Sequence, residues 1–144
     1  MYRGPRFGDA RRMQAEEMDR LIATHVGALV RGDSGAAVAR HAEDAEHDLA
    51  GATHGPVRGR SAVRRFYDHL VLDVRTESMV PVRRYHGEDF CVVEHEWSGR
   101  LQGSLLGTER STLRILQIFE FTDGKISRES VWMDDPSIAR RLTD

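Results

Sequence analysis

Apolar residues in the first half of the chain recur with the period of an α-helix. Residues 10–31 carry one apolar stripe on which His25 also lies, and its apolar members are Met18, Leu21, Ile22, Val26 and Leu29. A short second helix is predicted to begin at Asp33 or Ser34 and to run through Ala42. Ser61 is predicted to cap a third helix over residues 61–73, whose stripe is Val63, Phe66, Tyr67 and Leu70.

The second half changes to the alternating pattern of β-strands. After a brief strand over residues 43–51, four strands are predicted at 76–86, 89–99, 111–122 and 124–134. Residues 99–110 could extend the flanking strands into a long hairpin, and residues 134–144 are predicted to form a short cap. Three helices before a mostly antiparallel set of strands indicate an α+β domain. Its antiparallel sheet must curl over the three N-terminal helices into a cone that encloses an apolar cavity.

The composition favours one domain without a nucleic-acid-binding or membrane surface. The 144 residues suffice for one core, and we expect residues 15–144 to form a single domain behind a mobile arm, residues 1–14. The 21 basic and 23 acidic residues are interspersed, which argues against a basic nucleic-acid surface. Cys91 is the only cysteine, so no internal disulfide can form. Without a secretory signal or a membrane-spanning apolar run, we expect a cytoplasmic protein.

A polar residue interrupts the apolar face of the strand predicted at 111–122. Gln117 shares that face with Ile115, Phe119 and Phe121, because side chains alternate along a strand. A buried amide without a partner costs about 1–3 kcal/mol. Gln117 is therefore either hydrogen-bonded inside the core, with His25 or Tyr67 as partner, or offered to a ligand.

Several segments of the chain resemble the nuclear-transport-factor-2-like (NTF2-like) superfamily, and within it SnoaL-like polyketide cyclases and ketosteroid isomerases. They cover roughly residues 15–138 and read HVGALVRGDSGAAVARHAEDAEHDLAG, VRGRSAVRRFYDHL, EHEWSGRLQG and ILQIFEFTDGKISRESVWMDD. The resemblance implies a cone-shaped barrel with a deep apolar cavity and a homodimer built through the outer face of the sheet. It also implies a reaction without a cofactor on a hydrophobic small molecule.

The resemblance also suggests roles for individual residues. In ketosteroid isomerases a carboxylate moves a proton while two donors stabilise the dienolate oxygen. Gln117 falls where those enzymes keep the protonated aspartic acid of the oxyanion site, and His25 falls where they keep the donor tyrosine. Tyr67 and His41 fall at the positions of supporting tyrosines.

The position of the catalytic base in those enzymes falls at Leu49, which cannot move a proton. Asp48 is adjacent, and a shift of one residue in the strand could turn it inward. His95 shares a strand face with Cys91, Val93 and Trp97, and the family register turns this face into the cone, so His95 is the best candidate base.

Glu129 is a further candidate acid or base, in a row with Val131 and Met133 on the last strand. Its pKa could be raised by these apolar neighbours. Alternatively, Glu129 forms an ion pair with Arg114 or Arg128 near the rim.

The remaining inward positions are expected to contact the substrate. They are His47, Leu49, Val93, Trp97, Phe119, Phe121, Val131 and Met133. His47, His25, His95 and Glu129 together raise the possibility of a metal site, but their spacing matches no local ligand motif, so no metal is expected.

The family resemblance favours an enzyme that moves a proton next to a carbonyl group, or folds a reactive polyketide, in the cavity. One alternative is a carrier that holds a hydrophobic ligand without catalysis. Another is an interaction domain that uses the outer sheet face, where Leu116, Ile118 and Trp132 would be exposed in a monomer. A homodimer interface explains that surface more economically.

Overall fold

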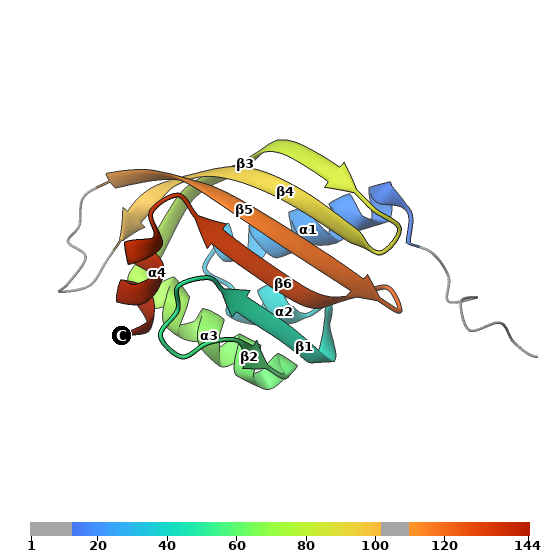
Figure 1. Cartoon of the computed structure of the whole chain (residues 1–144), viewed down its shortest axis with the longest axis horizontal. Coiled ribbons are helices and arrows are strands. Elements are labelled where there is room, and N and C mark those ends of the chain that lie inside the picture. The colour runs from blue at the N-terminus through green and yellow to red at the C-terminus, as the bar shows by residue number, and fades with distance from the viewer. Residues whose placement is uncertain (1–12, 102–109) are drawn as a thin grey trace, which may run out of the picture.

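A six-stranded sheet curves around three helices, and a fourth helix lies at one end of it (Figure 1). This computed structural model describes residues 13–101 and 110–144. The predicted arm therefore lies almost wholly outside the described residues, as does the centre of the segment 99–110. The elements are α1 (Ala15–Val30), α2 (Ser34–Val38), β1 (His41–Leu49), β2 (Val57–Arg58), α3 (Arg60–Asp73), β3 (Val74–His86), β4 (Phe90–Leu101), β5 (Arg110–Thr122), β6 (Lys125–Met133) and α4 (Pro136–Thr143).

The helices follow the predicted stripes but differ at their ends. Asp33 caps α2 by accepting a hydrogen bond from the Ala36 amide at 2.9 Å, and α2 is shorter than predicted because His41 already begins β1. The predicted cap at Ser61 is wrong, since α3 begins at Arg60. The residue before α3 is Gly59, whose φ of 95° is readily adopted only by glycine.

The strand order in the sheet is β2-β1-β6-β5-β4-β3. Neighbouring strands are antiparallel with one exception, because β1 and β6 run parallel. The predicted α+β class, with a curled sheet on three N-terminal helices, is confirmed, although this pairing makes the sheet mixed.

Alternation of side chains along β4 and β5 separates a buried inner face from an outer face. Cys91, Val93, His95 and Trp97 are buried on β4, as are Ile115, Gln117, Phe119 and Phe121 on β5, all as predicted. The outer face leaves Leu116 and Trp132 each 42% exposed, while Ile118 is only partly exposed. None of the described helices is both long enough and apolar enough to span a membrane.

The core includes two apolar clusters built on inner-face residues of the strands, and a group of buried polar residues lies in the same core. One cluster packs α1 against the inner faces of β4 and β5, including Val93, Phe119 and Phe121. The other contains Trp97, Ile115 and Val131 together with Ile138 of α4.

Candidate functional site

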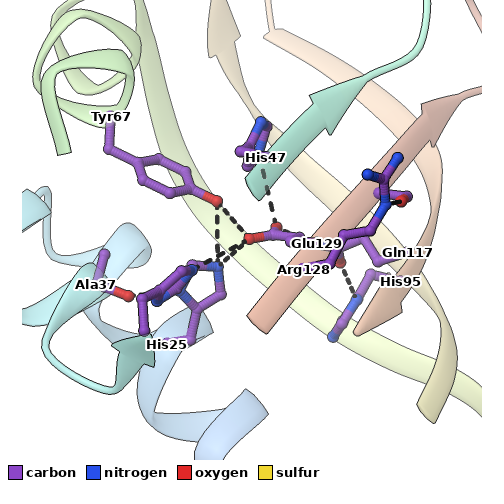
Figure 2. Close-up of polar contacts among 10 residues, drawn as sticks. His25, Ala37, His47, Tyr67, His95, Gln117, Arg128 and Glu129 are labelled. Atoms are coloured by element: carbon purple, nitrogen blue, oxygen red, sulfur yellow. Dashed lines mark hydrogen bonds and ion pairs between the residues drawn. The ribbon is translucent and has the colours of Figure 1, made fainter. Parts of the chain in front are cut away.

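The buried polar group is centred on the carboxylate of Glu129, whose residue is 1% exposed (Figure 2). Its Oε2 accepts a hydrogen bond from the Tyr67 hydroxyl at 2.7 Å and lies 3.2 Å from His25 Nε2. Its Oε1 accepts a hydrogen bond from Gln117 Nε2 at 3.0 Å. The ion pair considered from sequence, between Glu129 and Arg114 or Arg128, is therefore wrong.

Those two arginines pair on the outer side of the sheet instead. Arg114 donates to Glu94, and Arg128 donates to Glu46 and Asp48. Asp48 is one-third exposed there, 2.9 Å from Arg128 Nη2. The shift that would turn Asp48 inward is absent, because His47 pairs directly with Glu129, and Asp48 with Ser130, between β1 and β6. The structure thus keeps Asp48 away from Glu129.

Five elements bring the polar side chains together. The parallel pairing sets His47 beside Glu129, and β5 supplies Gln117 from the neighbouring strand. Helix α1 supplies His25 and helix α3 supplies Tyr67, both buried on the apolar stripes of their helices. No local sequence pattern connects these residues, so only packing of helices on the sheet gathers them.

Hydrogen bonding determines where the protons of this group lie. His25 Nδ1 is 2.7 Å from the Ala37 carbonyl oxygen, so Nδ1 must donate. Tyr67 gives its one proton to Glu129. A second proton is required between His25 Nε2 and Glu129 Oε2, since two lone pairs would repel at 3.2 Å. This proton lies either on His25, as an imidazolium, or on Glu129, as a carboxylic acid.

The pKa shifts of the two groups place this proton on His25, so that the pair is an imidazolium and a carboxylate. Burial favours the neutral form of Glu129, but the charge and hydrogen bond of His25 outweigh burial and hold the pKa of Glu129 well below its usual range. Burial likewise lowers the pKa of His25, and the nearby Glu129 carboxylate more than reverses this, so the pKa is raised. The raised pKa considered for Glu129 from sequence is wrong in direction.

Gln117 is held at both ends of its amide. Its Nε2 donates to Glu129, and its Oε1 accepts a hydrogen bond from His95 Nδ1 at 2.8 Å. The partners of Gln117 are thus Glu129 and His95, not His25 or Tyr67. Burial lowers the pKa of His95, so the ring is neutral at pH 7. Its Nδ1 carries the proton that is donated to the amide oxygen of Gln117.

An apolar cavity of about 80 Å³ lies against one side of this group. Five of the predicted contact residues line it, together with Tyr67, Gln117 and Glu129; the five are His47, Leu49, Trp97, Val131 and Met133. His95 and His25 do not line it. Neither do Val93, Phe119 and Phe121, because they pack against α1. Helix α4 contributes Ile138 and Leu142, which the sequence interpretation missed although their spacing of four residues is that of a helix face.

His47 is the titratable residue of the cavity wall with the fewest partners. It is 3% exposed, and its Nδ1 makes no hydrogen bond to any described residue. Its Nε2 lies 3.9 Å from Glu129 Oε1. Its ring packs against Phe66, with 4.4 Å between the two ring centroids. Burial lowers the pKa of His47 to about 4, so the ring is neutral at pH 7 and able to accept a proton from a ligand.

Removing the Tyr67 hydroxyl is expected to destabilise the fold. Tyr67→Phe deletes a buried 2.7 Å hydrogen bond to a carboxylate, and bonds to charged groups contribute about 1.5–3 kcal/mol. Urea unfolding at pH 7 should show a loss in this range. Tyr85→Phe on β3, where the residue is 60% exposed, is the matched control and should change stability by less than about 0.5 kcal/mol. Equal effects of both substitutions would contradict the assignment.

The fold and the site define an NTF2-like α+β domain in which a buried carboxylate adjoins an apolar cavity. The family profile described as the SnoaL-like domain matches residues 22–129, more than half of the chain. This protein therefore belongs to the SnoaL-like domain family. No curated protein sequence matches the chain.

Solved structures with the same fold include two whose names describe an activity. A presumed polyketide cyclase from Xanthomonas campestris is 20% identical with a TM-score of 0.70, covering 90% of this chain and 98% of its own. A presumed isomerase from Bacillus subtilis is 14% identical with a TM-score of 0.73, covering 83% and 87%. An NTF2-like protein from Burkholderia xenovorans is 19% identical with a TM-score of 0.72, covering 92% and 99%. At these identities the likeness establishes the fold.

Proposed function

We propose that this protein is a SnoaL-like cyclase or isomerase that moves a proton next to the carbonyl group of a hydrophobic small molecule. One observation carries the proposal. A neutral histidine, His47, and an ionised carboxylate, Glu129, both line an otherwise apolar cavity, 3.9 Å apart. His47 can thus accept a proton where an apolar ligand would bind, and the charge of Glu129 would stabilise the protonated ring.

In this reaction His47 is the catalytic base. The imidazole takes a proton from the carbon beside the carbonyl group and returns it to another atom of the same molecule, so no proton is gained or lost overall. Glu129 Oε1 stabilises the imidazolium that forms, as a carboxylate does for the histidine of a serine-hydrolase triad. The strongly lowered pKa of Glu129 suits this electrostatic role better than the role of base.

Gln117 is the proposed donor to the enolate oxygen. Its amide lines the cavity, and one of its two N–H groups donates to Glu129. The second N–H makes no hydrogen bond to a described residue and can therefore meet a substrate oxygen. His95 fixes the amide orientation from the other end and acts as a positioning residue.

The size of the cavity limits what it holds in this conformation. About 80 Å³ is less than the roughly 150 Å³ of an engineered protein cavity that admits benzene. A ring-sized substrate therefore requires the cavity to widen. A carrier without catalysis is the second candidate function, since the pKa of about 4 for His47 and the lowered pKa of Glu129 make both groups weak bases at pH 7.

The same proposal includes a cytoplasmic homodimer. Leu116 and Trp132 on the outer sheet face are each 42% exposed, and a second copy of the chain would cover them. Sedimentation that finds only monomer would favour an interaction domain instead.

Exchange of carbonyl-adjacent protons with solvent tests the chemistry directly. We expect the wild-type protein to accelerate deuterium incorporation into cyclohexanone or 2-tetralone in D2O, followed by NMR. His47→Leu should lower the rate about 100-fold or more, because general-base catalysis contributes about 10²–10⁴-fold. His69→Leu on the exposed side of α3 is the matched control and should leave the rate unchanged.

Two outcomes would overturn parts of the proposal. Binding of the ketones without faster exchange would favour the carrier. Faster exchange that survives in His47→Leu would remove His47 from the role of base.

A further inference from the structure

His41 is a buried histidine whose ring has no hydrogen-bond partner among the described residues. It is 1% exposed, and neither Nδ1 nor Nε2 is bonded. Its Nε2 lies 3.8 Å from Glu129 Oε2, too far for a hydrogen bond. Each unpaired buried polar atom costs about 1–3 kcal/mol, and such atoms in folded proteins usually contact an ion or water. The Nε2 atom of His41 is therefore the feature that needs an explanation.

His41 Nε2 belongs to a group of three possible metal ligands. His25, His41 and Glu129 each offer one atom, and the three atoms lie within 4.8 Å of one another. The separations to Glu129 Oε2 are 3.2 Å from His25 and 3.8 Å from His41. Tetrahedral Zn²⁺ with bonds of about 2.0–2.2 Å holds its ligand atoms about 3.3–3.6 Å apart. The two separations to Glu129 differ from this range by a few tenths of an ångström, and the third, between the two histidines, is within 4.8 Å.

The surroundings of the group match those of a metal site. His25 donates its Nδ1 proton to the Ala37 carbonyl oxygen, which turns Nε2 toward Glu129; metal-binding histidines are usually oriented by such a bond. Glu129 is fixed by Tyr67 and Gln117. The two oxygens of Glu129 differ, because Oε2 faces His25 and His41 while Oε1 faces Gln117 and His47.

We propose that His25, His41 and Glu129 Oε2 bind a divalent transition-metal ion, with Zn²⁺ as the best match. Two imidazoles and a carboxylate are ligands that Zn²⁺ accepts, and the absence of a thiolate among them disfavours Cu⁺. The ion would replace the proton that His25 and Glu129 share. The Tyr67 hydroxyl, 3.3 Å from His25 Nε2 and 2.7 Å from Glu129 Oε2, lies nearest to a fourth position.

This ion would position the carboxylate and would not contact a molecule in the cavity. Neither His25 nor His41 lines the cavity, so the inference does not depend on the proposed reaction. It departs from the expectation of no metal drawn from the sequence, where the spacing of ligands showed no motif. Asp19, His86 and Cys91 form another close group, but Asp19 already pairs with Arg84 and His86.

Cobalt absorption provides the first test. The full chain is unfolded in guanidinium with a chelator, freed of both, and refolded with Co²⁺ or Zn²⁺, because the buried ligands require access during folding. We expect one ion per chain by elemental analysis and, for Co²⁺, the intense visible bands of four-coordinate cobalt. Zn²⁺ should also raise Tm. Wild-type protein that folds with neither cobalt bands nor retained zinc would overturn the proposal.

Variants then locate the ion. His41→Phe should lose the visible cobalt bands. It should also weaken Zn²⁺ binding by more than about 100-fold, because loss of a residue that only hydrogen-bonds to a metal ligand already costs roughly 10–100-fold. His86→Phe, which alters the other close group, should bind as the wild type does. If His41→Phe fails to fold, Glu129→Gln serves as the second variant and should also lose the bands. Unchanged binding in a folded variant of His41 or Glu129 would overturn the assignment.

Failure of this inference can be distinguished from failure of the proposed reaction. His47→Leu should keep the ion and lose proton exchange. A protein that exchanges protons but binds no ion would retain the proposed function alone.

Discussion

Replacing Glu129 by alanine should lower the free energy of unfolding by about 3–5 kcal/mol, the usual cost of breaking a buried ion pair from one side. The substitution leaves the His25 imidazolium without its counter-ion and the Tyr67 hydroxyl and Gln117 amide without their acceptor. All four residues are at most 2% exposed, so water cannot replace the carboxylate unless the core opens. Urea unfolding at pH 7 with a chelator, followed by circular dichroism, measures the loss.

A matched control separates this effect from the loss of any glutamate. Glu96→Ala removes an exposed carboxylate on β4 and should change stability by less than about 0.5 kcal/mol. Glu129→Gln keeps the shape of the side chain and one acceptor oxygen, so its loss should fall between the two. If Glu129→Ala costs no more than Glu96→Ala, the buried ion pair does not exist in solution.

The second large effect is a loss of stability in mild acid caused by His47. Its pKa is about 4 in the folded protein against 6.5 for an unperturbed histidine, because burial disfavours the charged ring. Between these values the unfolded chain binds a proton at His47 that the folded protein does not, so stability falls as the pH falls. The difference of 2.5 units corresponds to about 3 kcal/mol between pH 7 and 4.

Of the other members of the group, Glu129 and His25 do not disturb this window, whereas His95 adds a loss of the same sign. Glu129 has a lowered pKa, so its contribution is present above about pH 4.5 and is lost only as the pH falls through the folded value. His25 has a raised pKa, so its contribution is complete below about pH 6.5 and is lost as the pH rises through the folded value. Between these limits protonation of His47, and of His95 whose pKa burial also lowers, reduces stability.

Comparison of His47→Leu with the wild type isolates this contribution. In urea unfolding at pH 6.5 and 4.5 with a chelator, the wild type should lose about 2 kcal/mol more than the variant. His69→Leu, an exposed histidine, should follow the wild type. If the free energy of unfolding falls equally between pH 6.5 and 4.5 in the wild type and in His47→Leu, His47 is not buried as a neutral ring.

Local periodicity was sufficient to predict much of the fold. The apolar stripes of α1 and α3 and the alternation along β4 and β5 indicated which side chains are buried. Each helix or strand has one buried face whose residues recur at a fixed spacing, so this face can be found within that element alone. Gln117 was correctly placed on an inner face, and the family resemblance correctly turned the rows of His95 and Glu129 inward, whereas the alternative that left Glu129 near the rim is wrong. The buried amide also signalled, from its cost alone, that a polar partner must be near.

Which residues meet was decided by tertiary structure. The parallel pairing of β1 with β6 sets His47, not Asp48, beside Glu129, and strands so distant in the chain have no local signal for their register. Glu129 is an ionised carboxylate because His25, Tyr67 and Gln117 come from three other elements to surround it. The chain by itself determined the buried faces through short-range spacing. Only the packing of helices on the sheet decided the partners, and hence the charge states and the site, since those contacts join residues that no sequence period relates.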